Sequence, residues 1–162
     1  MGAQVTAYIG LGSNRGDRYM YLKQAVAAIE GHDAMRVVCT SPVYESEAHV
    51  RTAEDSKAPF MNAVIKIRTS LQPTDLLRRC QAIERQAGRS HDTSDVWEAR
   101  TLDLDLLSYG TRTLETDELV LPHPRMGERL FVLQPLVDID PACWVPEPFE
   151  ASARELLAVC PD

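Results

Sequence analysis

The amino-acid sequence predicts a protein of the α+β class, and two observations predict it. Stretches with strand character and stretches with helical spacing follow one another in the order β-α-β-β-α-β up to about residue 109. The chain has 162 residues, 44% of them hydrophobic and 25% charged, which suits one domain with a sizeable core. We therefore expect a single domain over residues 1–162 with a ferredoxin-like βαββαβ core, an antiparallel sheet with helices packed on it, an extra hairpin and C-terminal helices.

The first half of this core contains three apolar or β-branched stretches and one helical pattern. Residues 5–12 are apolar and precede the turn-forming sequence GSNRGD, which predicts a strand and a turn. Leu22, Val26 and Ile29 recur at helical spacing and predict a helix over residues 17–30. The remaining expectations are a β-branched stretch at 35–46, a polar loop at 49–59 and a strand at 60–69.

The second half begins with a helix that has a start signal and a stop signal. Pro73 suits the first turn, Leu76 and Cys80 lie on the predicted buried face, and Gly88 ends the helix. We then expect a polar loop at 89–99, a strand at 100–109, a hairpin within 108–122, a helical or partly helical segment at 128–139 interrupted near Pro135, and a short helix at 151–159.

Charge and composition exclude several classes of protein. The net charge of −7 argues against general binding to nucleic acid or to a membrane surface. The sequence has no apolar run of transmembrane length, and its first residues lack the pattern of a signal peptide, so we expect a cytoplasmic protein. The four cysteines are scattered and are expected to be reduced, mostly in the core.

The glycine-rich sequence GLGSNRGD does not match a nucleotide-binding loop. Gly10, Gly12 and Gly16 are spaced one residue too far apart for a dinucleotide fingerprint, and the predicted element order does not make a parallel sheet. The sequence also has no G-x-x-x-x-G-K-[ST] motif. We interpret these glycines as part of a structural turn that permits close approach.

Asp103 and Asp105 carry the most specific chemical pattern. Strand alternation places both carboxylates on one face and Leu102, Leu104 and Leu106 on the other. Two carboxylates this close repel each other, so a positive charge is expected beside them. Spacing alone leaves two alternatives open, a solvated pair on an exposed face or a pair of ligands for Mg²⁺.

Candidate anion-binding side chains lie on either side of this strand in the sequence. Arg100 directly precedes the strand, and the segment LPHPRMGERLF brings His123, Arg125 and Arg129 close together in sequence. Gln81 and Glu84 are three residues apart beside the apolar stripe of the second helix, where a solvated helix edge is the simpler interpretation.

Five motifs together resemble one family. AYIGLGSNRGDR, PVYES, PFMNAV, RTLDLDLL and LPHPRMGERLFVLQPL occur in this order between about residues 6 and 147. They resemble the 6-hydroxymethyl-7,8-dihydropterin pyrophosphokinase family of folate biosynthesis, and R-x-x-D-[LIV]-D followed by P-H-P-R-M is the most specific part. The resemblance implies transfer of pyrophosphate from ATP to the pterin hydroxymethyl group, release of AMP and use of two Mg²⁺ ions.

The resemblance also implies roles for individual residues. Asp103 and Asp105 match the magnesium ligands, and Asn62 matches the residue that reads the pterin edge. Phe60 and Phe131 match two aromatic walls on either side of the ring. The other matched positions are Gln81, Glu84, Arg100, Leu106, His123 and Arg129 for ATP, Ser46 for pterin contact, Trp97 for closure of a loop over the site, and Arg89, which joins Arg100, Asp103, Asp105, His123 and Arg129 as a catalytic candidate.

One loop departs from the family pattern. The family usually has a basic residue, Trp, Gly, Pro and Arg before the aspartate strand, whereas this chain has VWEAR, with Glu98 and Ala99 in place of Gly and Pro. The loop is also one residue longer, so a second basic position falls near His91. We expect weaker closure of this loop, not a change of fold or substrate.

Two other functions compete with this interpretation. The altered loop motivates a catalytically weakened paralogue that binds pterin or nucleotide, and a metal-dependent phosphohydrolase on a similar sheet is a third alternative. The expected partners are ATP and hydroxymethyl-dihydropterin, with no nucleic acid and no membrane. An association with the next folate-pathway enzyme is left open.

Overall fold

The computed structural model describes residues 3–14, 16–46, 59–88 and 102–162, and an antiparallel sheet lies at its centre. The strands lie in the order β2-β4-β1-β5, with β3 also paired to β4, and every pairing is antiparallel. Helices α1 and α2 form the two connections of the predicted βαββαβ unit, so the ferredoxin-like fold is confirmed. The elements of this unit are β1 (Val5–Ser13), α1 (Arg18–Glu30), β2 (Met35–Thr40), β3 (Tyr44–Ser46), β4 (Phe60–Thr69), α2 (Pro73–Gln86) and β5 (Asp103–Tyr109).

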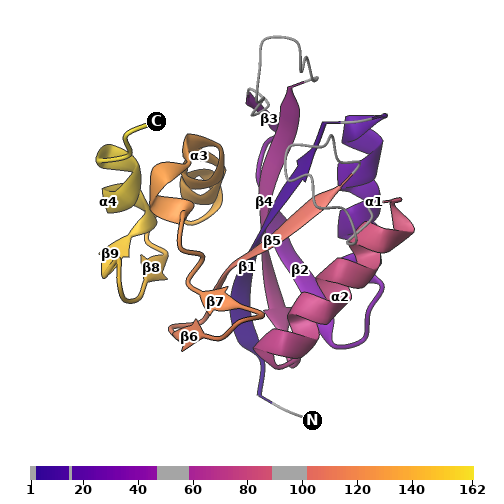
Figure 1. Cartoon of the computed structure of the whole chain (residues 1–162), viewed down its shortest axis with the longest axis horizontal. Helices are drawn as coiled ribbons and strands as arrows, with labels where there is room; N and C mark the ends of the chain where they lie inside the picture. Colours follow the sequence, from indigo (N-terminus) through magenta and orange to yellow (C-terminus); the bar gives the residue numbers. More distant parts are fainter. Residues whose placement is uncertain (1–2, 15, 47–58, 89–101) are drawn as a thin grey trace.

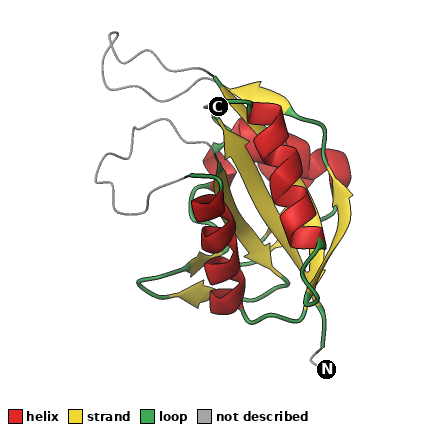
Figure 2. Cartoon of the chain, turned by 90° about the vertical axis from the view of Figure 1, so that its right-hand side faces the viewer, coloured by secondary structure: helices red, strands yellow, loops and turns green. Residues whose placement is uncertain are grey.

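Helices α1 and α2 cover one face of the sheet, and Figure 2 views the molecule from this side. The side chain of Asp17 accepts a hydrogen bond from the Met20 amide (3.1 Å) and begins α1. Gly88, at φ +93°, follows the end of α2 as the sequence predicts. The buried side chains between these helices and the sheet form what we call the first core, which includes Ile9, Leu22, Ile29, Ile65, Ile67, Leu76, Cys80, Ile83, Leu104, Leu106, Leu119 and Leu121.

The opposite face is covered by the C-terminal part of the chain, as Figure 1 shows. A capping box between Ser152 and Glu155 begins the short α4. The second core consists of Tyr8, Val64 and Leu107 from the sheet together with side chains such as Met126, Leu133, Leu136, Val145 and Leu156. The elements on this face are the 3-10 helix η1 (Met126–Glu128), α3 (Leu130–Ile139), β8 (Trp144–Val145), β9 (Ala151–Ser152) and α4 (Ala153–Ala158).

A β-bulge in the edge strand β5 changes which face its last residues occupy. Ile9 pairs with Leu106 whereas Tyr8 pairs with Ser108, so Leu107 is the additional residue. Leu107 lies in the second core, and Tyr109 returns to the first core. The bulge therefore ends the alternation that places Asp103 and Asp105 on the face opposite to α1 and α2, which we call the second face.

Two expectations about element interiors were wrong. Helix α3 continues through Pro135, because this residue and its neighbours Leu133 and Leu136 are buried and their packing offsets one lost backbone hydrogen bond. Gly10 and Gly12 lie inside β1, and only Gly16, at φ +70°, lies beyond its end. The strand pairs on both sides at these two glycines, so they do not form a turn.

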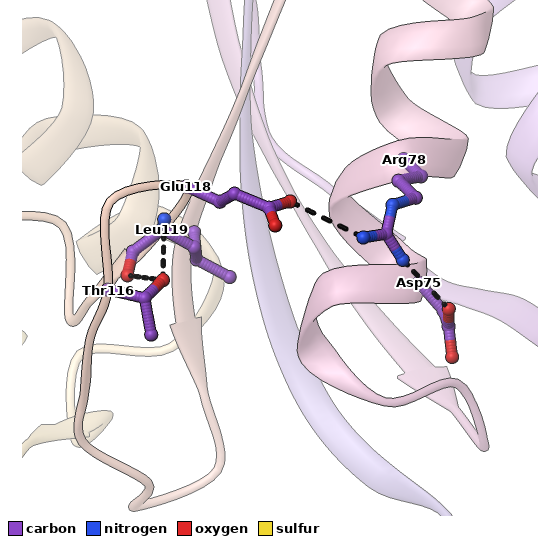
Figure 3. Close-up of polar contacts among 5 residues, drawn as sticks. All are labelled: Asp75, Arg78, Thr116, Glu118 and Leu119. Atoms are coloured by element: carbon purple, nitrogen blue, oxygen red, sulfur yellow. Dashed lines mark hydrogen bonds and ion pairs between the residues drawn. The ribbon is translucent and has the colours of Figure 1, made fainter.

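The predicted hairpin is present as β6 (Leu114–Glu115) and β7 (Val120–Leu121). Its turn is closed by Thr116, whose hydroxyl contacts both the amide and the carbonyl of Leu119 at 3.1 Å. Arg78 of α2 lies between Asp75 (3.6 Å) and Glu118 of the turn (3.5 Å), as Figure 3 shows. The buried Leu119 and Leu121 attach the hairpin to the first core.

The four cysteines are free thiols, as expected from their spacing, and Cys80 and Cys143 are buried. Burial is the main cause that raises the pKa of the Cys80 thiol to about 12 and that of Cys143 to about 11. Among the helices that the structure describes, none has the length and apolar character needed to cross a bilayer.

Candidate active site

The candidate site lies on the second face of the sheet, where three adjacent strands carry Asn62, Gly12 and Asp103. Gly12 of β1 pairs with Asn62 of β4 on one side and with Asp103 of β5 on the other. Directly paired residues present their side chains on the same face. One row across the sheet therefore joins the predicted pterin-reading residue to a predicted metal ligand.

Asp103 and Asp105 are both partly exposed on this face, as strand alternation predicted. The guanidinium of Arg129 lies 3.9 Å from the Asp105 carboxylate and 5.7 Å from the centre of the Phe131 ring. Arg129 therefore supplies positive charge beside the aspartate pair. The donor set also fits magnesium, because this ion prefers carboxylate oxygens and commonly takes only one or two from the protein together with substrate phosphates.

His123 is held as a neutral imidazole beside these charges. Burial, followed by Arg129, lowers the pKa of His123 to about 4, while Asp103 acts in the opposite direction. The Arg125 amide donates a hydrogen bond to Nδ1 of His123 (3.2 Å), and the His123 amide donates to the Leu107 carbonyl (2.8 Å). A neutral ring that accepts at Nδ1 carries its hydrogen on Nε2, which is then a donor.

Glu84 is buried, in contrast to the solvated helix edge considered from its spacing. Its side chain is only 3% exposed, and Oε2 accepts a hydrogen bond from the Leu104 amide at 2.7 Å. Leu104 lies between the two aspartates on an edge strand, so this bond attaches their strand to α2. Gln81, one turn earlier, is half-buried.

The predicted pterin-contacting residues that the structure describes lie at the junction of β3, β4 and α3. Asn62 is 4% exposed, and its Nδ2 donates to Ser46 Oγ (2.7 Å). Phe60 is on the same strand as Asn62, and Phe131 is in the first turn of α3. An open cavity of about 860 Å³ lies beside them, lined by Tyr44, Glu45, Ser46, Arg125, Glu128, Arg129, Leu130, Phe131, Gln134, Pro161 and Asp162.

Three contacts that the sequence did not indicate hold α3 in place. The Tyr44 hydroxyl donates to Asp138 near the end of α3, which also accepts from Gln134 (3.2 Å). The Asp162 carboxylate accepts from the Leu130 amide (3.2 Å) at the start of the helix. The contacts of Tyr44 with Asp138 and of Leu130 with Asp162 join residues far apart in the chain, so no local pattern could have indicated them, whereas Gln134 and Asp138 are one helical turn apart.

The remaining predicted residues are placed as follows. The side chain of Leu106 is buried in the first core, on the face opposite to Asp105. Arg89, Trp97 and Arg100, together with the departure at Glu98 and Ala99, lie outside the described residues.

Solved structures with the same fold include enzymes in which this unit is part of a longer chain. One HPPK-DHPS structure with substrates superposes with a TM-score of 0.70 at 12% identity, covering 96% of this chain and 43% of that chain. A Plasmodium falciparum HPPK-DHPS variant gives a TM-score of 0.72 at 12% identity, covering 97% and 45%. The chain therefore spans less than half of these solved chains, and at this identity the likeness establishes the fold alone.

Sequence comparison identifies the family. The family model described as 7,8-dihydro-6-hydroxymethylpterin-pyrophosphokinase (HPPK) matches residues 8–141. A 2-amino-4-hydroxy-6-hydroxymethyldihydropteridine pyrophosphokinase of Bacillus subtilis is 46% identical over 133 residues, covering 82% of this chain and 77% of that protein. The enzyme of the same name from Pseudomonas aeruginosa is 39% identical over 154 residues, covering 95% and 91%. This chain therefore belongs to the 7,8-dihydro-6-hydroxymethylpterin-pyrophosphokinase family.

Proposed function

We propose that this protein transfers the pyrophosphoryl group of ATP to 6-hydroxymethyl-7,8-dihydropterin, giving the pterin diphosphate and AMP. The observation that carries the proposal is the row across the sheet in which Asn62 and Asp103 lie on one face, on either side of β1. A ring-reading amide and a metal-binding carboxylate are thereby held at a fixed separation. Relatives named as this pyrophosphokinase support the choice of substrates.

The reaction is a displacement at the β-phosphorus of ATP. The pterin hydroxymethyl oxygen forms a bond to this phosphorus, and the bond to the oxygen that bridges to the α-phosphate breaks. AMP leaves with the electron pair, and the hydroxyl proton is released. Reactions of this kind depend mainly on positioning and on charge stabilisation by the site.

We assign the charged end of the site to the triphosphate. Asp103 and Asp105 would hold two Mg²⁺ ions, which when bound neutralise phosphate charge. Arg129 offers a forked cation, and neutral His123 offers an Nε2 hydrogen to a phosphate oxygen. Arg89, Arg100, Gln81, Glu84 and Leu106 are further ATP or catalytic positions that rest on the resemblance.

We assign the other end of the row to the pterin. With its Nδ2 bonded to Ser46, Asn62 has its amide oxygen available to accept from a ring N–H. Phe60 and Phe131 would pack on the ring, and Trp97 would close over it. The contact of Tyr44 with Asp138 supports this arrangement, because it fixes the helix that carries Phe131 against the strand that carries Ser46.

An association with the next folate-pathway enzyme is a further proposal. It is supported by the solved HPPK-DHPS chains, in which the matching unit is joined to a second part. The fungal folic acid synthesis protein fol1 of Schizosaccharomyces pombe is similarly longer, since this chain covers 18% of it at 36% identity.

The test is to incubate the protein with ATP, Mg²⁺ and 6-hydroxymethyl-7,8-dihydropterin and to quantify the nucleotides and pterins. We expect AMP to form in step with pterin diphosphate and only when both substrates are present. Binding of ATP without AMP formation at any magnesium concentration would instead favour the weakened paralogue. Release of inorganic phosphate with ADP would favour the phosphohydrolase.

A further inference from the structure

We infer that Gly12 is a specificity-determining residue, because its bare backbone forms the surface across which the pterin ring lies. This inference rests on the proposed function, and it assigns a role to a residue in the middle of a strand, where glycine is otherwise unfavourable. A glycine inside a strand loses more conformational entropy than alanine and has no side chain to pack. We therefore attribute the glycine at this position to the need for free space on the face of the sheet where Asn62 and Asp103 lie.

The position of Gly12 between Asn62 and Asp103 is set by strand register. Neighbouring strands lie about 4.8 Å apart, so two residues on either side of β1 are roughly 10 Å apart across the sheet. Asn62 and Asp103 both present their side chains on the face of Gly12. A substrate that contacts the Asn62 amide and brings its hydroxymethyl oxygen to the metal end has to cross the backbone of Gly12.

The surroundings of Gly12 show what a side chain would occupy. A Cβ at this position would lie 3.4 Å from Asn62 Oδ1 and 3.4 Å from Cδ1 of the Phe60 ring. Both are ordinary van der Waals contacts, so the unliganded protein has room for a methyl group. The methyl would nevertheless fill the space between the amide oxygen that reads the ring and the aromatic wall beside it.

Gly10 is the matched comparison, two residues earlier on the same face of β1. The atoms nearest to a Cβ there belong to the side chain of Leu107, the closest at 3.6 Å, and Leu107 belongs to the second core. The strand partners of Gly10 are Val64 and Asp105 and its nearest side chain is Leu107, whereas a Cβ at Gly12 would contact the two predicted pterin-contacting residues Asn62 and Phe60. Comparing alanine substitutions at the two glycines therefore separates the effect of an added methyl group on the strand from its effect on pterin binding.

The experiment compares Gly12→Ala and Gly10→Ala with the unchanged protein. Equilibrium unfolding should give Gly12→Ala a stability equal to or above that of the unchanged protein, because alanine is favoured over glycine in a strand. Binding of the dihydropterin, measured by calorimetry with a non-hydrolysable ATP analogue and Mg²⁺ present, should weaken by about tenfold or more, which is the scale of one misplaced methyl group in a site. Binding of the ATP analogue alone should change by less than about two-fold, and Gly10→Ala should bind the pterin within the same limit.

Several results would overturn the inference. Unchanged pterin affinity in a folded Gly12→Ala protein would show that the ring does not lie over this residue. An equal loss of pterin affinity in Gly10→Ala would show that the added methyl group acts through the strand and not through contact with the ring. A Gly12→Ala protein that fails to fold would contradict the ordinary van der Waals contacts described above. Failure of the proposed function is distinguishable, because the unchanged protein itself would then form no AMP.

Discussion

At the scale of single residues, Glu84 connects the helix α2 to the strand that carries the aspartates. Replacing it with alanine leaves the Leu104 amide without this acceptor, which should cost about 1–3 kcal/mol in the free energy of unfolding. Glu84→Gln keeps an acceptor oxygen of similar reach and should cost less. Urea unfolding of both variants measures the difference.

The control for this prediction is Gln81→Ala on the same helix, one turn earlier. Gln81 is half-buried, and we expect its replacement to change stability by less than that of Glu84. A Glu84→Ala protein as stable as the Gln81→Ala protein would show that the bond to Leu104 contributes nothing measurable.

Arg129 and a bound metal ion are expected to compete for Asp105. The guanidinium lies 3.9 Å from this carboxylate in a partly exposed pair, whose contribution is about 0–1 kcal/mol. Arg129→Gln should therefore tighten the binding of Mn²⁺, used as a probe for Mg²⁺, by up to about five-fold without nucleotide. In the presence of ATP the same change should weaken nucleotide binding, because a phosphate contact is lost.

The matched control is Arg125→Gln, which removes the same charge from the same segment. Arg125 is exposed and contacts Glu128 at 3.4 Å, so its loss removes one positive charge without removing the contact of Arg129 with Asp105. Titration of Mn²⁺ by electron paramagnetic resonance reports free metal directly. Equal affinities in the two variants would contradict a specific competition at Asp105.

The residue roles that could be predicted from sequence depend on local spacing. Asp103 and Asp105 are two residues apart in a strand, and their common face follows from alternation alone. The contact between Tyr44 and Asp138 joins residues 94 positions apart, and that of Leu130 with Asp162 joins residues 32 apart. Such pairs depend on how elements pack, which no single-sequence pattern encodes.

At the scale of elements, the hydroxyl of Thr116 adds two side-chain contacts to the turn of the β6–β7 hairpin. Thr116→Val keeps the shape of the side chain and removes the two contacts with Leu119, which should lower the free energy of unfolding by about 1 kcal/mol. Thr116→Ser keeps the hydroxyl and should be closer to the unchanged protein. Thermal unfolding followed by circular dichroism measures both.

The nearby ion pair provides a comparison for the hairpin. Arg78 and Glu118 are both more than half exposed, so Glu118→Gln should cost less than about 1 kcal/mol and less still at high salt. A larger loss for Glu118→Gln than for Thr116→Val would mean that the hairpin is held mainly by its contact with α2.

Helices and strands were predictable where the sequence has one clear hydrophobic period. Irregularities inside an element, such as a proline within a helix or a bulge within a strand, were not. The helix α1 follows from the spacing of Leu22, Val26 and Ile29, and the start of α2 follows from Pro73; both helices are present. The helix through Pro135 and the bulge at Leu107 were not predictable. The helix continues through Pro135 because burial of its neighbours in the second core offsets a lost backbone hydrogen bond, and the bulge is a feature of how β5 pairs with β1.

At the scale of the whole molecule, the two faces of the sheet have different roles. The first core extends over the face covered by α1 and α2, and the second face is shared between the second core and the candidate site. A partly buried contact attaches the C-terminal part to this face: the Tyr8 hydroxyl donates to Asp140, which also lies 3.4 Å from Lys66. Burial and the carboxylate of Asp140 raise the pKa of Tyr8, so its phenol remains a donor.

The position of the second core in the chain has a consequence for synthesis on the ribosome. The buried residues of the first core lie between Ala7 and Leu121. In the part of the chain that the structure describes, Tyr8, Val64 and Leu107 instead share their buried cluster with residues from Met126 onward. A nascent chain can thus complete the βαββαβ unit while one face of its sheet is still an uncovered apolar surface. During that interval the chain is open to association with other chains or with chaperones. Because Phe131 also comes from this late segment, the proposed pterin site would be complete only after the C-terminal part has covered this face.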